Sequence, residues 1–307
     1  MKAAVCTRYG PPDVLHVREV ERPAPKRNDL LVRVRASAVT SSDWIVRSGF
    51  GSSLTYRILG RLAVGIRAPR RSILGLVVVG DVEAVGDDVS KYEVGDQVFA
   101  LTMTRFGGYA QYACLPESSL VGRKPSNLTH AEAASIPYGG LLALHFLRKG
   151  VVGRRRRVLI YGASGAVGTS AVQLARWFGA DVTGVCSIRN LELVRSLGAD
   201  TVIDYTREDV TAGGRSYDLI FVAVGDRLSP PSKSACRGIL TPDGAYVFVD
   251  QGRPKLRAED LVFLEKLAKA GHLKPVIDRS YPLEEIAAAH RYVEQEHKRG
   301  NVIIRVD

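Results

Sequence analysis

Three glycines with the spacing of a phosphate-binding turn stand near the middle of the chain: Gly162, Gly165 and Gly168. They follow an apolar run at 158–161, which predicts a buried strand, and they open a helical pattern. Glycine permits a tight turn, and the free backbone N–H groups at a helix start bind phosphate. The first glycine of the usual fingerprint G-x-G-x-x-G is replaced here by Ala163. The pattern therefore predicts a strand, a turn and a helix that hold the phosphates of a dinucleotide.

The elements that must position this turn alternate along the chain behind it. Further strands are expected at 181–185, 201–203, 217–222 and 245–249, with a helix at 190–197. This alternation predicts a parallel sheet with helices on both faces. The alternative is that the three glycines only allow close packing, but they lie where a cofactor-binding turn belongs in such a sheet.

The end of the second strand indicates which nicotinamide cofactor is bound. An acidic residue at this place binds the ribose hydroxyls of NAD, and its charge repels a 2′-phosphate. The chain has no acid there: Ser187 offers a hydrogen bond and Arg189 a positive charge, while Glu192 falls within the next helix. These residues favour NADPH. The alternative for Arg189 is an ordinary solvated arginine.

Composition limits the remaining classes of protein. The chain has 307 residues, 46% hydrophobic and 24% charged, which suits two globular domains. Its four cysteines are isolated, so neither a disulfide framework nor a clustered zinc site is indicated. No apolar run can span a bilayer, and the first residues enter a strand-like pattern without the features of a signal peptide. We therefore expect a cytoplasmic protein with no membrane partner.

The net charge of +11 raises the question of nucleic-acid binding. The most compact basic run, Arg154 to Arg157, directly precedes a predicted strand, where a solvated turn is expected. It is not interleaved with aromatic residues and belongs to no recognisable nucleic-acid module. A soluble basic face is the favoured interpretation, and no nucleic-acid partner is expected.

The first part of the chain has a different pattern. Residues 2–35, 77–86 and 94–99 contain short strand-like runs with Gly, Pro and Asp turns, which predicts a barrel-like all-β unit. A helical stretch at 126–147 leads into the alternating region. The tail, from 276 onwards, contains a helix between two strand-like pieces, and we expect it to return to the barrel.

This combination resembles the medium-chain dehydrogenase/reductase superfamily, and within it the zinc-free quinone oxidoreductase branch. The resemblance covers nearly the whole chain, and the order and spacing of its motifs are specific. The motifs are Met1-Lys-Ala-Ala-Val with Tyr9-Gly-Pro-Pro, Val94-Gly-Asp-Gln-Val-Phe, Gly107-Gly-Tyr-Ala-Gln-Tyr, the glycine turn, Leu197-Gly-Ala-Asp-Thr-Val-Ile-Asp-Tyr, and Gly300-Asn-Val-Ile-Ile.

The resemblance implies an α/β plus β architecture. A GroES-like β-barrel domain with the substrate and catalytic residues is expected at 1–124. A Rossmann NADP-binding domain with a doubly wound parallel sheet is expected at 125–272, and the return to the first domain at 273–307. The implied activity is metal-independent hydride transfer from NADPH to a quinone, an enone (an α,β-unsaturated carbonyl) or a related carbonyl. Many members are homodimers.

The resemblance also bears on zinc. Zinc-dependent relatives have a cysteine where this chain has Thr40, and a His-Glu pair where it has Leu76 and Val77. The cysteine-rich loop expected after Phe99 is missing as well. Hydroxyl and apolar groups do not replace the thiolate, imidazole and carboxylate ligands of zinc. We therefore expect no metal.

The site residues implied by the resemblance fall into two groups. Thr40, which replaces an asparagine of many zinc-free relatives, Tyr56 and Tyr138 are the candidate proton donors, although each tyrosine could equally be a packing residue. An enone could also take its proton from water. The residues expected to bind the cofactor are Ser164, Gly165, Ala166, Val167, Ser187, Arg189, Tyr205, Ala223, Val224 and Asn301.

One segment departs from the family pattern. After Val249 the chain passes almost directly to Glu259, where relatives carry a further loop, helix and strand. That region normally completes the Rossmann sheet and contributes to the dimer edge, so its shortening bears on both activity and dimerisation. Two functions therefore stay open. The first is an NADPH-dependent quinone or enone reductase, and the alternative is a non-catalytic NADPH-binding sensor or scaffold on the same fold.

Overall fold

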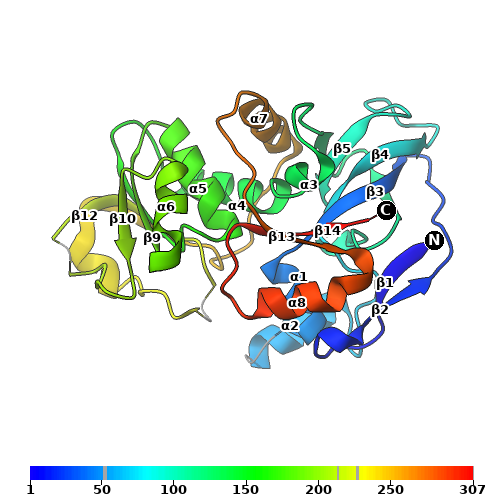
Figure 1. Cartoon of the computed structure of the whole chain (residues 1–307), viewed down its shortest axis with the longest axis horizontal. Helices are drawn as coiled ribbons and strands as arrows, with labels where there is room; N and C mark the ends of the chain where they lie inside the picture. The colour runs from blue at the N-terminus through cyan, green and yellow to red at the C-terminus, as the bar shows by residue number, and fades with distance from the viewer. Residues whose placement is uncertain (51–53, 213, 226–227, 307) are drawn as a thin grey trace. The chain divides into compact units, whose positions relative to one another are not determined.

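The computed structural model describes residues 1–50, 54–212, 214–225 and 228–306, apart from the side chains of 54–56. The chain divides into two compact units (Figure 1). Unit 1 comprises residues 1–137 and 277–307, and unit 2 comprises residues 138–276. Each unit is described by itself below.

Five parallel strands form the centre of unit 2, in the spatial order β10-β9-β8-β11-β12. The predicted parallel sheet with alternating helices is thereby confirmed. The elements are α4 (Pro137–Lys149), β8 (Arg157–Tyr161), α5 (Ala166–Trp177), β9 (Asp181–Cys186), the 3-10 helix η3 (Ile188–Asn190), α6 (Leu191–Ser196), β10 (Thr201–Asp204), β11 (Tyr217–Val222), the 3-10 helix η5 (Ala235–Ile239), β12 (Leu240–Phe248) and α7 (Ala258–Lys269).

The helix behind the glycine turn is buried along most of its length. Every residue of α5 from Ala166 to Ala175 is buried, and the helix packs on β8 and β9 (Figure 1). Small residues allow this close packing. A Cβ on Gly139 in α4 would overlap the carbonyl oxygen of Ala166, so the two helices meet backbone to backbone. Gln173 of α5 also exchanges two hydrogen bonds with the backbone of Lys274, at 3.1 and 2.7 Å.

The strand β12 forms one edge of this sheet. It begins at Leu240, earlier than the predicted 245–249, and its register against β11 shifts between Tyr217 and Leu219. Only Val247 of its residues is buried. Within the described part of unit 2 no further strand pairs with its outer side. A shifted, polar and half-exposed strand is a common way to keep a sheet edge from pairing with another chain.

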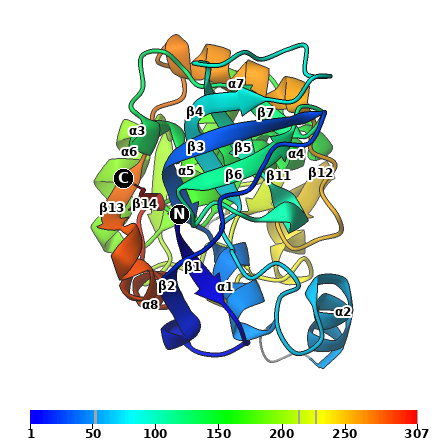
Figure 2. The same cartoon turned by 90° about the vertical axis from the view of Figure 1, so that its right-hand side faces the viewer.

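Unit 1 is built on the long strand β3, which pairs with β4, β6 and β14 (Figure 2). Its seven-stranded sheet runs β13-β14-β3-β4-β5-β7, with β6 also on β3, and β1 and β2 form a separate pair. The β elements are β1 (Lys2–Cys6), β2 (Leu15–Glu19), β3 (Asp29–Val39), β4 (Val77–Val85), β5 (Gln97–Leu101), β6 (Tyr112–Pro116), β7 (Leu120–Arg123), β13 (Ile277–Pro282) and β14 (Asn301–Arg305). The two C-terminal strands thus complete the sheet of the N-terminal region.

The helices of unit 1 lie around this sheet. They are the 3-10 helices η1 (Pro12–Val14), η2 (Met103–Arg105) and η6 (Leu283–Glu285), with α1 (Ser41–Ser48), α2 (Leu54–Val64), α3 (His130–Ala133) and α8 (Ile286–Glu294). The sequence analysis did not predict α1 and α2. Gly49, with a φ of 86°, ends α1 in the left-handed conformation that favours glycine.

Candidate cofactor site

The glycine turn has a geometry that needs glycine at two of its positions. Gly162 has a φ of +78°, and a Cβ there would overlap Val224. A Cβ on Gly168 would overlap the carbonyl oxygen of Gly162, because the helix starts directly over the end of the strand. The N–H groups of Gly162 and Ala163 donate to the carbonyl of Val185 at 3.0 and 2.9 Å. The turn is therefore fixed to the neighbouring strand β9.

The start of α5 carries donors that no cap from a described side chain satisfies. Gly165 is the N-cap and makes no side-chain cap, so the first N–H groups, from Ala166 and Val167, have no partner within the helix. A Cβ on Gly165 would meet only the carbonyl oxygen of Gly162, at 3.6 Å, so the space beside this cap residue is open. Uncapped N–H groups beside an open space fit a phosphate.

A buried asparagine joins the turn to the loop after β9. The Asn190 Nδ2 donates to Ser164 Oγ at 3.1 Å and to Ser187 Oγ at 3.3 Å. Its Oδ1 is buried and has no hydrogen-bond partner among the described residues. Asn190, which was not predicted from the sequence, brings two predicted cofactor residues into one cluster.

The loop after β9 carries the predicted 2′-phosphate residues. Arg189 is exposed, and no carboxylate of the described residues forms an ion pair with it. Tyr205 is exposed directly after β10, and its N–H donates to the Cys186 carbonyl at 3.3 Å. Asp204, at the end of β10, accepts from the backbone and hydroxyl of Thr206, at 3.0 and 2.8 Å. The strand β9 itself ends without an acid, as the NADPH prediction requires.

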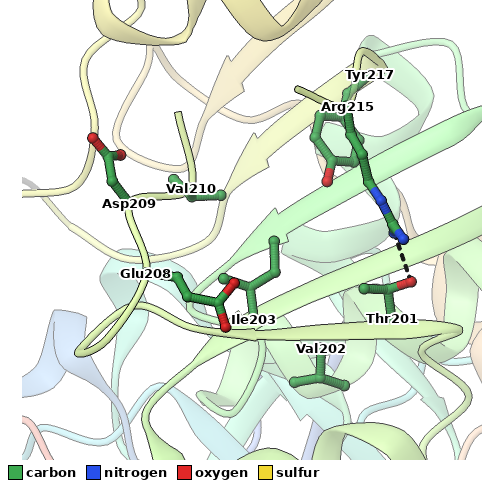
Figure 3. Close-up of a pocket in the computed structure, with 8 residues that line it drawn as sticks. All are labelled: Thr201, Val202, Ile203, Glu208, Asp209, Val210, Arg215 and Tyr217. Carbon is green, nitrogen blue, oxygen red and sulfur yellow. Dashed lines mark hydrogen bonds between the residues drawn. The ribbon is translucent and has the colours of Figure 1, made fainter. Parts of the chain in front are cut away.

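Two hollows flank the β10 edge of the sheet. The larger, of about 390 Å³, is lined by Tyr161 and Tyr205, whose rings lie 6.0 Å apart. The smaller, of about 190 Å³, lies beside β10, where Arg215 donates to Thr201 at 2.9 Å (Figure 3). Glu208 lines both hollows. Asp209 lines both hollows as well, while Arg215 lines the smaller and Arg207 the larger, so each hollow has a lining of mixed charge.

The loop after β11 reaches the glycine turn from the other side. The N–H of Ala223 donates to the Tyr161 carbonyl at 2.9 Å, and Val224 packs beside Gly162. Unit 2 thus gathers the predicted cofactor residues of the turn and of both loops, together with Asn190. The exception is Asn301, which is buried at the start of β14 in unit 1.

Thr40 is engaged within unit 1. Its hydroxyl donates to Asp43 Oδ2 at 2.6 Å and accepts from the Asp43 N–H at 3.2 Å, which forms a capping box at the start of α1. Asp43 also accepts from the Thr40 N–H at 2.9 Å and the Leu76 N–H at 3.1 Å. Burial raises the pKa of Asp43 to about 6, although these bonds oppose the rise. Thr40 as proton donor to a substrate stays a prediction, with its one proton already donated to Asp43.

A buried polar cluster continues from this box. Arg47, His290, Tyr109 and Asp43 are all fully buried. Arg47 Nε donates to His290 Nδ1 at 3.4 Å and the guanidinium forms an ion pair with Glu294, while the Tyr109 and His290 rings lie edge to face at 5.7 Å. Burial, together with the charge of Arg47, lowers the pKa of His290 to about 3. The cluster fixes α1 against α8.

The two candidate tyrosines lie at helix starts. Tyr138 is half-buried in the first turn of α4, next to Gly139, which touches the start of α5. Tyr56 belongs to the first turn of α2, and its side chain falls outside the described residues. Their roles as proton donors stay predictions.

The described residues contain no cluster of three or more His, Cys, Asp or Glu that could hold a metal ion. Thr40, Leu76 and Val77 occupy the positions where zinc-dependent relatives have ligands, and two of the three are apolar. None of the described helices has the length and apolarity that crossing a bilayer requires.

Comparison with protein families matches both units. The alcohol dehydrogenase GroES-like domain matches residues 26–126. Two families described as zinc-binding dehydrogenase match residues 166–271 and 251–304. The first of these two begins at Ala166 and covers α5 and the strands β9 to β12.

Similar proteins cover the whole chain. A mitochondrial NAD(P)H oxidoreductase of Mus musculus is 31% identical over 100% of this chain and 89% of its own length. A chloroplastic NADPH-dependent alkenal/one oxidoreductase of Arabidopsis thaliana is 31% identical over 99% of this chain and 79% of its own. The structure of the quinone oxidoreductase from Coxiella burnetii superimposes with a TM-score of 0.84 at 27% identity, over 100% of this chain and 99% of that one.

These matches settle the family. The chain belongs to the medium-chain dehydrogenase/reductase superfamily, in its quinone oxidoreductase branch. The resemblance drawn from the sequence motifs and the predicted fold class are thereby confirmed. The alignment with the Mus musculus protein spans 359 positions, so that relative carries insertions compared with the 307 residues here.

Proposed function

We propose that the protein is an NADPH-dependent reductase of quinones or enones. The uncapped start of α5, beside the strand β9 that is followed by Ser187 and Arg189 instead of an acid, is the observation that carries the proposal. Relatives named quinone oxidoreductase, alkenal/one oxidoreductase and 2-methylene-furan-3-one reductase support the substrate class. A nicotinamide cofactor agrees with the NAD(P)H oxidoreductases among them. NADPH in particular rests on Ser187 and Arg189.

The residues around the turn divide the binding of the cofactor among them. The N–H groups of Ala166 and Val167 would hold the pyrophosphate, with Ser164 and Gly165 shaping the approach. Ser187, Arg189 and Tyr205 would bind the 2′-phosphate, because a guanidinium binds phosphate with charged hydrogen bonds. Ala223 and Val224 would border the nicotinamide side, and the role of Asn301 of unit 1 stays a prediction.

The bound nicotinamide would supply the hydride, and the protein would supply position and the exclusion of water. Water is a sufficient proton source for a quinone or an enone that has accepted a hydride. The proposal therefore needs neither a metal nor Thr40, whose hydroxyl bonds to Asp43. Dimerisation, a cytoplasmic location and the domain boundaries stay predictions.

The test begins with cofactor binding. Fluorescence titration of the purified chain with NADPH and with NADH should give saturable binding with a preference for NADPH. NADPH oxidation should then be followed with a panel of quinones and alkenals. Equal affinity for both cofactors would remove the 2′-phosphate assignment but keep the fold. No binding of either would overturn the oxidoreductase proposal.

A non-catalytic NADPH-binding protein is the second candidate. The observation in its favour is the short connection between Val249 and Glu259, where the family resemblance implies a further loop, helix and strand. Tight NADPH binding without oxidation by any substrate of the panel would support this candidate. Turnover with any of them would exclude it.

A further inference from the structure

The outward face of α2 in unit 1 is apolar. Ile58, Leu59 and Leu62 are 52%, 62% and 56% exposed, and Ile66 just beyond the helix is 65% exposed. Ile58 and Leu62 are four residues apart and lie on one face of α2, and Ile66 follows after the helix has ended at Val64. A surface helix normally turns its apolar side to the core, whereas α2 exposes three large apolar side chains.

The helix is nevertheless held firmly to unit 1. A Cβ on Gly60 would overlap the ring of Phe50, and the Arg61 guanidinium stacks on the ring of Tyr9 at 5.0 Å. The Tyr9 hydroxyl donates to the Gly65 carbonyl at 2.6 Å. These contacts define the inner side of α2. In both views the helix lies at one end of unit 1, next to α1 and away from β3 and β4 (Figures 1 and 2). The apolar face of α2 therefore has a fixed position on the surface of unit 1.

Positive charge surrounds this face. The segment 44–80 contains no Asp or Glu. Arg57, Arg67, Arg70 and Arg71 are exposed, and no carboxylate of the described residues forms an ion pair with any of the four. Arg70 donates to the Leu62 carbonyl at 3.3 Å, which ties the basic segment to the helix end.

We propose that α2 and residues 66–71 bind the surface of an anionic phospholipid bilayer. An apolar helix face rimmed by arginines matches the interface of such a membrane, where acyl chains lie beneath negative headgroups. The helix lies on the bilayer and does not cross it, since α2 has only 11 residues. A second copy of the chain is a worse occupant, because it would bring the same unpaired arginines against themselves.

The proposal revises the expectation that no membrane is involved, and it does not rest on the proposed function. It does suit that function, because quinones are apolar molecules that partition into bilayers. A reductase held at the membrane surface would meet its substrate there. Membrane binding is measured without cofactor, so failure of one proposal leaves the other testable.

The experiment is flotation of the full chain with vesicles of phosphatidylcholine, with and without phosphatidylglycerol. We expect binding that rises with the phosphatidylglycerol fraction and falls with added salt. Arg67→Gln with Arg71→Gln should weaken partitioning by about thirtyfold. The matched control, Arg154→Gln with Arg155→Gln, removes the same charge from unit 2 and should have little effect.

The apolar contribution is tested separately. Leu59→Ser with Leu62→Ser should weaken partitioning by about tenfold or more, since both side chains would lose burial among acyl chains. Val94→Ser, at a residue 63% exposed elsewhere in unit 1, is the control. Circular dichroism verifies that each variant is folded.

Three results would overturn the proposal. The first is no binding to phosphatidylglycerol vesicles. The second is equal loss in both arginine pairs, which would indicate nonspecific attraction. The third is self-association that Leu59→Ser with Leu62→Ser abolishes, without vesicle binding, which would assign the face to a second copy.

Discussion

Two helix starts, one in each unit, differ in how their first N–H groups are satisfied. In unit 1, α1 begins at Thr40, where a capping box with Asp43 closes the helix start. In unit 2, α5 begins at Gly165 without any side-chain cap. A good cap contributes about 1 kcal/mol to stability. The start of α5 lacks this contribution, and its first N–H groups stay available to a ligand. The closed start is a structural joint, whereas the open one is suited to bind an anion.

The largest effect is expected from a substitution that fills the space between the start of α5 and the carbonyl oxygen of Gly162. Gly168→Ala places a Cβ on the carbonyl oxygen of Gly162, so strand end and helix start must separate. We expect a loss of about 3 kcal/mol or more in the free energy of unfolding and loss of NADPH binding. Urea denaturation and fluorescence titration measure the two effects. Gly153→Ala, where a Cβ meets nothing within 4 Å, is the control. Unchanged stability and binding in Gly168→Ala would contradict the turn geometry.

The buried cluster of unit 1 that contains Asp43 and His290 should affect how the stability of the protein depends on pH. The pKa of Asp43 is raised to about 6, so its contribution to stability is present below pH 4 and is lost as the pH rises through 6. The pKa of His290 is lowered to about 3, so its contribution is present above pH 6.5 and is lost as the pH falls through 3. Between pH 4 and 6 the two slopes have opposite signs and offset each other.

Replacing either Asp43 or His290 should reveal the pH dependence of stability that the other residue causes. In Asp43→Asn the free energy of unfolding should fall by about 3 kcal/mol more than in the wild type from pH 6 to pH 4, because His290 then acts alone. In His290→Gln it should instead rise by about 3 kcal/mol over the same change. Urea denaturation at three pH values compares slopes, so the constant loss from the broken capping box cancels. Parallel curves for all three proteins would contradict the assigned burial of both groups.

The local features of the open start could be predicted from the sequence, because they depend on neighbouring residues. The spacing of the glycines predicted the turn, and the apolar runs predicted the strands beside it. Asn190 could not be predicted, since its role depends on Ser164 being brought next to it by the packing of α6 on β9 and β10. The boundary of β12 was missed because the shift at its start depends on β11.

The closed start did leave a signal that was overlooked. Thr40-Ser-Ser-Asp43 has the S/T-x-x-D/E spacing of a capping box, but Thr40 was interpreted as the counterpart of a zinc ligand and as a candidate proton donor. For the apolar residues of α2, the pattern alone was not enough to predict which side of the helix is exposed. Their spacing is visible in the sequence, but the side of the helix that faces water depends on the contacts of Gly60 and Arg61.

The next smaller effect is expected from the positive charge of Arg189. Arg189→Gln should weaken NADPH binding by about tenfold to a hundredfold and leave NADH binding unchanged, since a charged hydrogen bond contributes about 1.5–3 kcal/mol. The ratio of the two dissociation constants is the readout. Arg154→Gln, an exposed arginine of the same unit, controls for net charge. An equal change with both cofactors would assign Arg189 to the solvated surface.

Asn190 should act on both cofactors alike. Asn190→Ala removes the link between Ser164 and Ser187, and we expect NADPH and NADH to bind about fivefold more weakly, in line with the loss of about 1 kcal/mol for a neutral hydrogen bond. Ser196→Ala, on the exposed side of α6, is the control. A loss confined to NADPH would instead place Asn190 at the 2′-phosphate.

The smallest effect on turnover is expected at Thr40, although the residue is a candidate proton donor. Thr40→Val removes the hydroxyl that caps α1, so the free energy of unfolding should fall by about 1 kcal/mol while kcat stays within about twofold. Thr40→Ser keeps the cap and should change neither. Since the hydroxyl donates its only proton to Asp43, a structural role predicts this pattern. A fall in kcat of about a hundredfold in Thr40→Val, restored in Thr40→Ser, would instead show that the closed start opens during turnover and that Thr40 donates to the substrate.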